Sequence, residues 1–375
     1  MKVFVAADVH LSNALPYAKQ NSASMALEGT DRLRDICDAV LSAATIAYDE
    51  GARRTIFLGD LLDRRLIDGV TDYWAKSLLI SLRRLGYTID IIPGNHEAED
   101  RQASAYSVSA YGIEIEGVRV LIDGPGDDTG IWPVAYRPES VVTPILGKIP
   151  DGFVPFIHQT VRGAHCGVWD SPSGIDPEVL SRFPWVVSGH FHTSQPLVAP
   201  ANGLYLGATV QHHFGDANDE RSCWLVDMST HTAERIPTPA PKFKELKVRA
   251  KDDSWAVMQA FTETMKLIPG GYLSLKVSGE MSEISQFRNS AYPELEKQSK
   301  GILRFIEFSP DVTVEAKDRL ETRGRIRSGE ISWKAMVSRW VANNACNAHG
   351  VSQSKAFEMG ERLITLAAQK VGEAP

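Results

Sequence analysis

The stretch DIIPGNHEAED, residues 90–100, places three polar side chains on one tight turn after an apolar strand pattern. The apolar residues 91–92 are followed by a Pro-Gly pair, a combination that ends strands and forms turns. Asn95, His96 and Glu97 then come together where the strand is expected to end. Taken alone, this could be an ordinary polar loop, because Asn and Gly are common turn residues. Its meaning therefore depends on the residues at the ends of the other strands.

Short apolar runs alternate with helical patterns on either side of this stretch. Strands are predicted at 3–7, 55–60 and 88–93, with helices at about 31–48 and 70–85 between them. This alternation predicts βαβ units and a buried sheet in an α/β fold. A hairpin is predicted at 113–123, and further strands at 153–158, 185–190, 204–208 and 223–228.

Polar side chains stand at or just beyond the carboxyl ends of five predicted strands. These side chains are Asp8 and His10; Asp60 and Asp63; Asn95, His96 and Glu97; His158; and His190 and His192. In open α/β sheets, ligands bind and catalytic groups lie at the carboxyl ends of strands. Because packing does not require Asp, Asn or His at five such ends, the pattern indicates a functional site.

The residue types and their spacing favour a metal site. In Asp8-x-His10 and His190-x-His192, alternate residues of an extended chain would point to the same side. Carboxylate, imidazole and amide ligands suit Mn, Fe or Zn rather than Ca. The set holds more ligands than one tetrahedral ion can use, so two metal ions bridged by a carboxylate are implied. Gly59 and Gly189 leave room where the backbone must crowd such ions.

Composition and charge place the chain in a broad class. A length of 375 residues predicts two or three domains, and 43% hydrophobic with 23% charged residues is ordinary for a globular protein. No apolar run is long enough to span a bilayer, the N-terminus turns polar too early for a signal peptide, and the four cysteines form no CxxC pair. We therefore expect a cytoplasmic protein without a membrane segment.

The charge is unevenly distributed. The formal net charge is −7, yet the chain from Lys242 onward holds 21 basic and 17 acidic residues. An acidic front half suits a cation site, and a mildly basic rear half could meet a polyanion.

The rear half is predicted to contain additional parts. Three prolines in 236–242 indicate a linker, and a strand–helix–strand–helix–strand pattern then runs to about residue 310, with its second helix at 283–297. An arginine-rich stretch at 316–330 is expected to be a flexible tether, and two amphipathic helices are expected to close the chain.

The five motifs resemble those of calcineurin-like metallophosphoesterases. D-x-H, G-D-x-x-D, G-N-H-[DE], a single H and G-H-x-H occur here in that family's order, over roughly residues 1–235. The resemblance implies a β-sandwich flanked by helices, to which the rear half of this chain adds a small α/β capping domain and a C-terminal helix pair. It also implies two groups of metal ligands: Asp8, His10, Asp60 and His192 for the first ion, and Asp60, Asn95, His158 and His190 for the second, with Asp60 bridging. His96 would then bind no metal but would stabilise the transition state or protonate the leaving oxygen.

Other candidates have more than one interpretation. Asp63 is expected to orient a ligand or cap a helix, and Glu97 to orient His96 as a hydrogen-bond acceptor. His165 is an alternative to His158 as the single-histidine ligand; His158 is preferred because it directly follows an apolar strand. His212 and His213 are expected to lie in a loop near the mouth of the site, with contact to substrate as the alternative.

The order of parts resembles the SbcD-type nuclease subunits of double-strand-break repair complexes, including phage recombination endonucleases. The corresponding parts are a phosphoesterase (nuclease) domain at 1–238, a DNA-binding cap at 243–312, a basic linker at 313–329 and an ATPase-binding segment at 330–375. The resemblance implies an exonuclease and endonuclease dependent on two divalent ions, most simply Mn²⁺. It further implies DNA as substrate, an SMC-like coiled-coil ATPase of the SbcC type docked on residues 330–371, and a homodimer formed by helices between the 60s and 110s. The protein would act in DNA repair or recombination, in bacterial cytoplasm or in the host of a phage.

Two other functions stay open from the sequence. The chain could be a phosphodiesterase for small molecules or cyclic nucleotides whose extra domain serves oligomerisation. Hydrolysis of bis-p-nitrophenyl phosphate without any cleavage of DNA would favour it. The chain could also be a non-catalytic adaptor for the ATPase, which the complete ligand set argues against.

Overall fold

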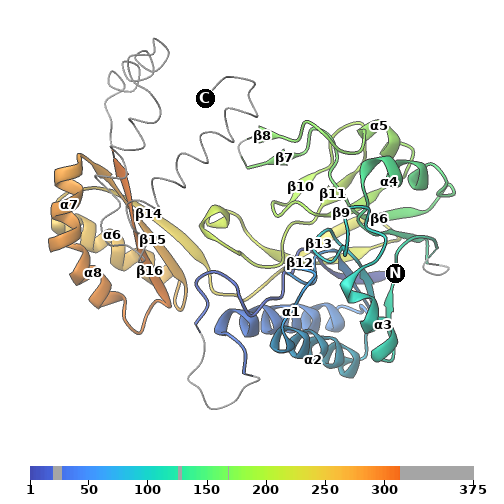
Figure 1. Cartoon of the computed structure of the whole chain (residues 1–375), viewed down its shortest axis with the longest axis horizontal. Helices are drawn as coiled ribbons and strands as arrows, with labels where there is room; N and C mark the ends of the chain where they lie inside the picture. The colour runs from blue at the N-terminus through green and yellow to red at the C-terminus, as the bar shows by residue number, and fades with distance from the viewer. Residues whose placement is uncertain (20–27, 126–128, 168, 313–375) are drawn as a thin grey trace, which may run out of the picture. The chain divides into compact units, whose positions relative to one another are not determined.

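The computed structural model describes residues 1–19, 28–125, 129–167 and 169–312 (Figure 1). The chain divides into two compact units. The larger unit comprises Met1–Lys247, Asp253–Lys276 and Tyr292–Ser309; of the described residues, the smaller comprises Val248–Asp252, Val277–Ala291 and 310–312. The predicted linker 313–329 and ATPase-binding segment 330–375 lie outside the described residues.

A six-stranded sheet with the order β13-β12-β1-β2-β3-β4 forms one half of the core of the larger unit. Its strands are β1 (Lys2–Ala6), β2 (Arg54–Leu58), β3 (Thr88–Ile92), β4 (Val118–Val120), β12 (Ser222–Asp227) and β13 (Thr232–Pro237). β1 to β4 run parallel, whereas β12 lies antiparallel to both β1 and β13. The predicted strands at 3–7, 55–60, 88–93 and 223–228 are thus confirmed within one or two residues at their ends.

A five-stranded sheet with the order β10-β11-β9-β6-β5 forms the other half. Its strands are β5 (Ile131–Val134), β6 (Val154–His158), β9 (Val186–Gly189), β10 (Gln195–Pro196) and β11 (Gly203–Tyr205), and a separate hairpin pairs β7 (His165–Cys166) with β8 (Trp169–Asp170). The strands predicted at 153–158, 185–190 and 204–208 correspond to β6, β9 and β11. The unpredicted β5 and β10 each contain a proline, which obscures a strand pattern because proline removes a ladder hydrogen bond.

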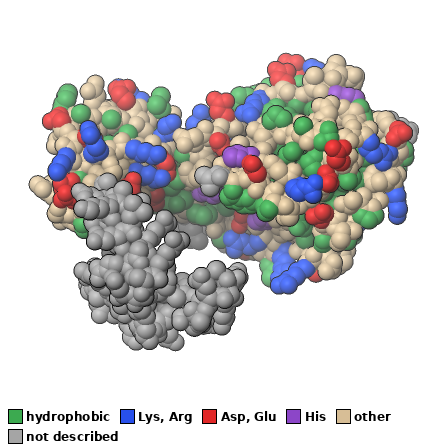
Figure 2. Space-filling view, turned by 90° about the horizontal axis from the view of Figure 1, so that it is seen from above, with side chains coloured by type: hydrophobic (Ala, Val, Ile, Leu, Met, Phe, Trp, Pro, Cys, Tyr) green, Lys and Arg blue, Asp and Glu red, His purple; other side chains and the backbone are tan. Residues whose placement is uncertain are grey.

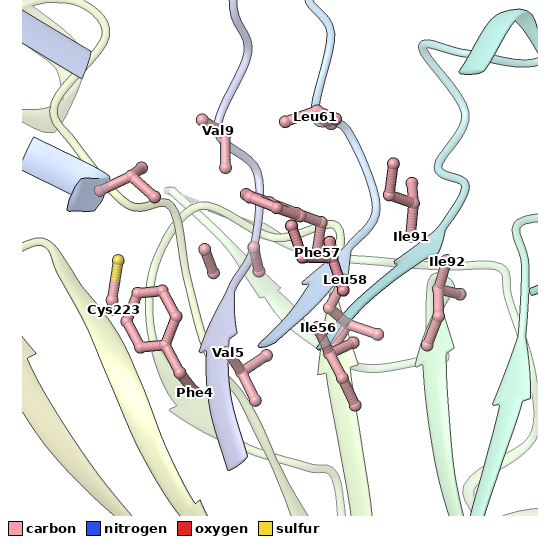
Figure 3. Packing of buried hydrophobic residues seen from close by; sticks show 14 of the residues in the cluster. Phe4, Val5, Val9, Ile56, Phe57, Leu58, Leu61, Ile91, Ile92 and Cys223 are labelled. Carbon is pink, nitrogen blue, oxygen red and sulfur yellow. The ribbon is translucent and has the colours of Figure 1, made fainter. Parts of the chain in front are cut away.

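The two sheets pack face to face with helices on their outer sides. Phe57 of β2 belongs to the same core cluster as Phe156 of β6 and Val187 of β9. Figure 3 shows side chains of this cluster, with Val9 and Leu61 just beyond the carboxyl ends of β1 and β2. α1 (Asp31–Asp49) and α2 (Gly69–Leu85) add side chains to that cluster, and α4 (Glu139–Leu146) and α5 (Pro177–Leu180) pack on the second sheet. This α–β–β–α arrangement confirms the predicted α/β class.

The helices begin and end where the sequence provides caps. The Thr30 side chain accepts a hydrogen bond from the Leu33 amide at the start of α1, and Asp68 accepts one from Thr71 at the start of α2. Such side chains satisfy backbone donors that have no partner inside the helix. α2 ends at Gly86, whose left-handed φ of 108° is readily adopted only by glycine. Both predicted helices are confirmed.

The hairpin predicted at 113–123 is wrong. A 3₁₀ turn (Ser107–Ala110) and the short helix α3 (Tyr111–Glu114) precede β4, which pairs parallel with β3. A parallel partner cannot be reached through a two-residue turn, so the chain uses this helical crossover.

A buried ion-pair cluster joins three neighbouring strands. Asp90 of β3 is fully buried and accepts from Arg54 of β2 at 2.6 Å and from Arg119 of β4 at 2.7 Å. The cluster fixes β4 beside β3, and its members are too far apart in sequence for any local pattern to have revealed it.

A three-stranded sheet follows, with the order β14-β15-β16. Its elements are β14 (Phe243–Arg249), α6 (Ser254–Leu267), β15 (Tyr272–Gly279), α7 (Met281–Ser290), α8 (Tyr292–Ser299) and β16 (Phe305–Val312). The single helix predicted at 283–297 is two helices, because Pro293 favours the first turn of a new helix. The predicted linker is also shorter, since residues 236–237 belong to β13.

Two further expectations concern helices and cysteines. No helix among the described residues combines the length and apolar character needed to cross a membrane. In keeping with the absence of a CxxC pair, Cys37 and Cys223 are buried free thiols and Cys166 is a partly exposed one.

Candidate metal centre

The structure brings all seven predicted ligands to one place at the carboxyl ends of β1, β2, β3, β6 and β9. The loops after β1 and β2 lie side by side, since the amides of Asp8 and His10 donate to the carbonyls of Gly59 and Asp60. His158 is the last residue of β6, and His190 directly follows β9. Parallel strands thus bring residues up to about 180 positions apart to one edge, as the sequence predicted.

The first group contains Asp8, His10 and His192, whose ligand atoms all lie within 4.8 Å of one another. The Nε2 atoms of His10 and His192 are 3.0 Å apart. Asp60 adjoins this group, with its Oδ2 atom 3.8 Å from Nε2 of His10.

The second group also adjoins Asp60, and its His158 lies near Asp8 of the first group as well, with 3.9 Å between Nε2 of His158 and Oδ1 of Asp8. Nε2 of His158 is 3.3 Å from Oδ2 of Asp60 and 3.2 Å from Oδ1 of Asn95. Nδ1 of His190 is 2.9 Å from the same Asn95 oxygen. Because Asp60 adjoins both groups, it stands where a bridging ligand would be needed.

Neighbouring groups fix which ring nitrogen faces the centre. Nδ1 of His158 lies 3.0 Å from the Leu58 carbonyl, to which an N–H must donate, so Nε2 is the nitrogen that faces the centre. Nε2 of His190 lies 2.8 Å from the Thr160 hydroxyl, which leaves Nδ1 for the centre. Such outer contacts orient metal-binding histidines. The sequence interpretation did not include Thr160, although it stands only two residues beyond His158.

The backbone of the centre is unusual in a way the sequence interpretation missed. Asp8, His10, Asp60 and His190 have positive φ values of 49°, 52°, 50° and 93°. Their side chains therefore converge through left-handed turns, and not through the alternation of an extended chain as expected. Non-glycine residues in this region are strained and persist where surrounding structure holds them, often at functional sites.

Glycines leave the space that these turns need. A Cβ atom on Gly189 would collide with the Leu58 carbonyl and the His158 ring, and one on Gly94 would collide with Asp60. Gly59 is crowded in the same way by His158 and has a φ of 78°. The expectation that Gly59 and Gly189 leave room at the centre is therefore met.

Burial sets the protonation state of His10 and His190. It lowers the pKa of His10 to about 3 and that of His190 to about 3, so both rings are neutral and able to bind a cation. Burial likewise raises the pKa of Asp8.

Asp60 and His158 form a buried ion pair. Burial alone would raise the pKa of Asp60 and lower that of His158. The mutual attraction and hydrogen bond reverse both effects, holding the pKa of Asp60 below its ordinary value and raising that of His158 to about 9. A divalent cation between them would take the place of the His158 proton.

His96 stands beside the predicted ligands with its ring half exposed. Its Nδ1 atom contacts the Asp63 carbonyl, and its Nε2 atom lies 3.9 Å from Oδ2 of Asp60. The side chain of Asp63 lies 3.7 Å from Nδ1 of His10. Asp63 is therefore placed to orient His96 through its backbone carbonyl, while its carboxylate stands near His10 without a hydrogen bond to it.

The orienting role expected for Glu97 is wrong. Its fully buried carboxylate accepts hydrogen bonds from the amides of Asp60, Leu62 and Gly94, at 3.1, 2.7 and 2.7 Å. Burial and the nearby charge of Asp60 raise its pKa to about 7. Glu97 thus ties the loop of Asp60 to the turn after β3, while the Asp63 carbonyl orients His96.

The remaining histidines separate clearly. His165 is exposed on the β7–β8 hairpin and contacts Asp170, so it does not compete with His158. His213 is exposed, as expected for a loop. His212 also lies in a loop, as expected, but it is buried with its ring centroid 5.0 Å from that of His10, so it does not stand at the mouth of the site.

The donor set fits two divalent cations of the Mn, Fe or Zn type. It consists of imidazole nitrogens, carboxylates and one amide oxygen, converging as two adjacent groups around Asp60. The crowding glycines and strained turns keep the backbone close to both groups, as a preformed site requires.

Comparison with known proteins supports a metal-dependent nuclease or phosphodiesterase. No family model matches the chain. Exonuclease subunit 1 of Enterobacteria phage T4 is 26% identical over 306 residues, which cover 76% of this chain and 89% of that relative. This chain is similar to a phage nuclease subunit. The similarity confirms the resemblance to nuclease subunits that the order of parts suggested.

One solved structure has a partly similar backbone. A dimetal phosphatase from Danio rerio shares 13% identity with a TM-score of 0.35, covering 60% of this chain and 91% of that one.

Proposed function

We propose that this protein is a metal-dependent phosphodiesterase that cleaves DNA. The main support is the double group of ligands around Asp60, and the similarity to a phage exonuclease subunit supports DNA as the substrate. When bound, two divalent cations supply a water of low pKa and neutralise charge on a phosphate. Mn²⁺ is the proposed ion, because the ligand set contains nitrogen, carboxylate and amide oxygen without thiolate.

The protein's own residues have distinct roles in this proposal. Asp8, His10, Asp60 and His192 hold the first cation. Asp60, Asn95, His158 and His190 hold the second. His96 binds neither, and its Nε2 atom faces the phosphate, where it donates a proton or hydrogen bond to the leaving oxygen. Nδ1 of His96 stays engaged by Asp63, so the ring cannot turn away.

The test of this proposal is His96→Ala in the full chain. We expect calorimetry to show two bound Mn²⁺ ions, while cleavage of linear and single-stranded DNA falls at least about a hundredfold. His165→Ala, which removes an exposed histidine outside the centre, is the matched control. Normal DNA cleavage by His96→Ala would refute the assigned role. Hydrolysis of bis-p-nitrophenyl phosphate without DNA cleavage by the wild type would instead indicate the small-molecule phosphodiesterase.

We further propose that DNA contacts the small domain at 243–312. Figure 2 shows basic and acidic side chains interspersed over the visible face, so a broad single-sign surface is not the basis for this proposal. Its support is the exposed Trp255 at the start of α6, since aromatic side chains stack on unpaired bases. Trp255→Ala should weaken binding of single-stranded DNA severalfold in a fluorescence titration, without changing Mn²⁺ affinity. Unchanged binding would contradict it.

A partner protein is proposed for residues 330–371. The phage relative is named as a subunit, and an SMC-like ATPase is the partner that the order of parts suggests. Deleting 330–375 should abolish ATPase binding in a pull-down but preserve Mn²⁺-dependent cleavage. Such a complex would act in DNA repair or recombination in the cytoplasm of a bacterium or of a phage's host.

A homodimer is proposed through α2 and its neighbours. Leu66, Tyr73 and Ile113 are exposed apolar residues in this region, at 75%, 47% and 89% of full exposure. α3 lies against α2, since the Tyr111 hydroxyl donates to Asp72. Ile113→Glu should convert a dimer to a monomer in light scattering, and an unchanged mass would contradict this interface.

A further inference from the structure

His212 is a buried imidazole for which the proposed reaction has no use. It lies in the turn before the 3₁₀ segment Phe214–Asp216, with 7% of its surface exposed. Its ring centroid is 5.0 Å from that of His10 and 5.4 Å from that of His192. Both neighbours are proposed ligands of the first cation.

The same imidazole also contacts the backbone of a third ligand of this cation. Nε2 of His212 is 3.3 Å from the carbonyl of Asp8, so its N–H donates there. Asp8 has a left-handed φ of 49°, and a bond to its carbonyl helps hold this strained peptide in place. The two rings that His212 contacts, those of His10 and His192, belong to this first group, whereas the Asp8 carboxylate also lies 3.9 Å from Nε2 of His158.

The main chain of His212 is fixed from the opposite side. The buried guanidinium of Arg32 donates to the carbonyls of His212 and Gln211 at 2.9 and 3.1 Å. The amide of His212 donates to Asp216 at 2.8 Å, and Asp216 in turn pairs with Arg221 at 2.7 Å. The backbone of His212 is therefore fixed by Arg32 and Asp216, while its ring contacts the rings of His10 and His192.

We propose that His212 is a positioning residue for the first cation. This role rests on the proposed two-cation function and makes the two groups differ. The His212 side chain positions Asp8, His10 and His192. The histidines of the second group are instead oriented by Leu58 and Thr160. A residue that served only the hydrophobic core would lower stability and would not distinguish one cation from the other.

The test is a calorimetric titration of the full chain with MnCl₂. His212→Leu keeps the bulk but removes the N–H donor, and we expect one of two ions to bind about tenfold to a hundredfold more weakly while the other changes less than threefold. His212→Gln, whose amide nitrogen reaches as far as Nε2, should restore the weakened ion to within a few-fold of wild type. His231→Leu, which removes an exposed histidine at the β12–β13 turn, should leave both affinities unchanged.

Several results would overturn the proposal. These are wild-type affinity for both ions in His212→Leu, equal weakening of both ions, and no recovery in His212→Gln. Should His212→Leu fail to fold in a thermal melt, His212→Asn replaces it, because its amide is too short to reach the Asp8 carbonyl, and the same outcomes apply.

The titration also separates this inference from the proposed function. Two ions bound by a wild-type protein that cleaves no DNA would refute the nuclease and leave His212 testable. Two ions bound normally by His212→Leu, in a protein that cleaves DNA, would refute only the role of His212.

Discussion

Gly59→Ala is a single-methyl change that should displace a ligand of the second cation. Gly59 stands between β2 and Asp60, and its φ is 78°. An added Cβ would lie 1.8 Å from Nδ1 of His158, far inside any real contact distance. His158 is fully buried and its Nδ1–H donates to the Leu58 carbonyl, so the ring cannot move without losing that bond.

The cost of this change can be divided into three parts. Holding an alanine in the left-handed region costs about 1 kcal/mol. Pushing a buried ring aside costs about 1–3 kcal/mol. Losing the hydrogen bond from His158 to Leu58 costs about 1 kcal/mol. The free energy of unfolding should therefore fall by about 3–5 kcal/mol, and the second Mn²⁺ ion should bind at least about tenfold more weakly.

The assay combines urea denaturation with calorimetric titration of Mn²⁺. Gly130→Ala is the matched control: Gly130 has the same φ of 78°, but no described atom lies within 4 Å of an added Cβ. The control should lose only about 1 kcal/mol, and it should bind both ions normally. Equal stability of the two variants, or unchanged binding of two ions by Gly59→Ala, would refute the argument that the absent side chain makes room for His158.

Three further predictions concern charge and metal. Asp90→Asn should lower the free energy of unfolding, measured in urea, by about 3–5 kcal/mol, because it removes the buried negative charge that Arg54 and Arg119 both contact. The exposed Asp151→Asn should have little effect, and a similarly small loss in Asp90→Asn would contradict the prediction. The affinity for the second Mn²⁺ ion should rise about tenfold per pH unit from 7 up to about 9, because the ion displaces the His158 proton below that pKa; a titration without proton release would refute it. Mn²⁺ at a hundred times the dissociation constant of one site should raise the free energy of unfolding by about 2.7 kcal/mol, and a chelator should remove this gain; an unfolding midpoint insensitive to both would contradict the metal centre.

The sequence was informative about the site because the ligands follow strands. An apolar run that stops at Asp8, Asp60 or His158 can be recognised locally, and parallel strands bring their carboxyl ends together. The residues of the centre were therefore predictable even though they are separated by most of the first 192 residues.

The supporting contacts were not predictable in the same way. Thr160, Leu58 and His212 contact the proposed ligands through a hydroxyl, a carbonyl and a ring, none of which has a local pattern. Glu97 stands beside His96 in sequence, yet its carboxylate points back to the amides of the neighbouring loop. Adjacent residues on a tight turn face different ways, so the adjacency of Glu97 and His96 in sequence predicted the wrong hydrogen-bond partner for Glu97.

The turn at residues 94–97 shows clearly what the sequence determines and what only the tertiary structure decides. The sequence by itself determined the alternation of strands and helices, the α/β class and the residues gathered at the strand ends, because these depend on local periodicity and on the geometry of parallel sheets. Only the tertiary structure decided that Thr160 orients His190, that Glu97 ties two loops together and that the His212 ring packs beside those of His10 and His192. Those facts depend on left-handed backbone turns and on contacts between segments up to about 200 residues apart, for which the chain carries no local signal.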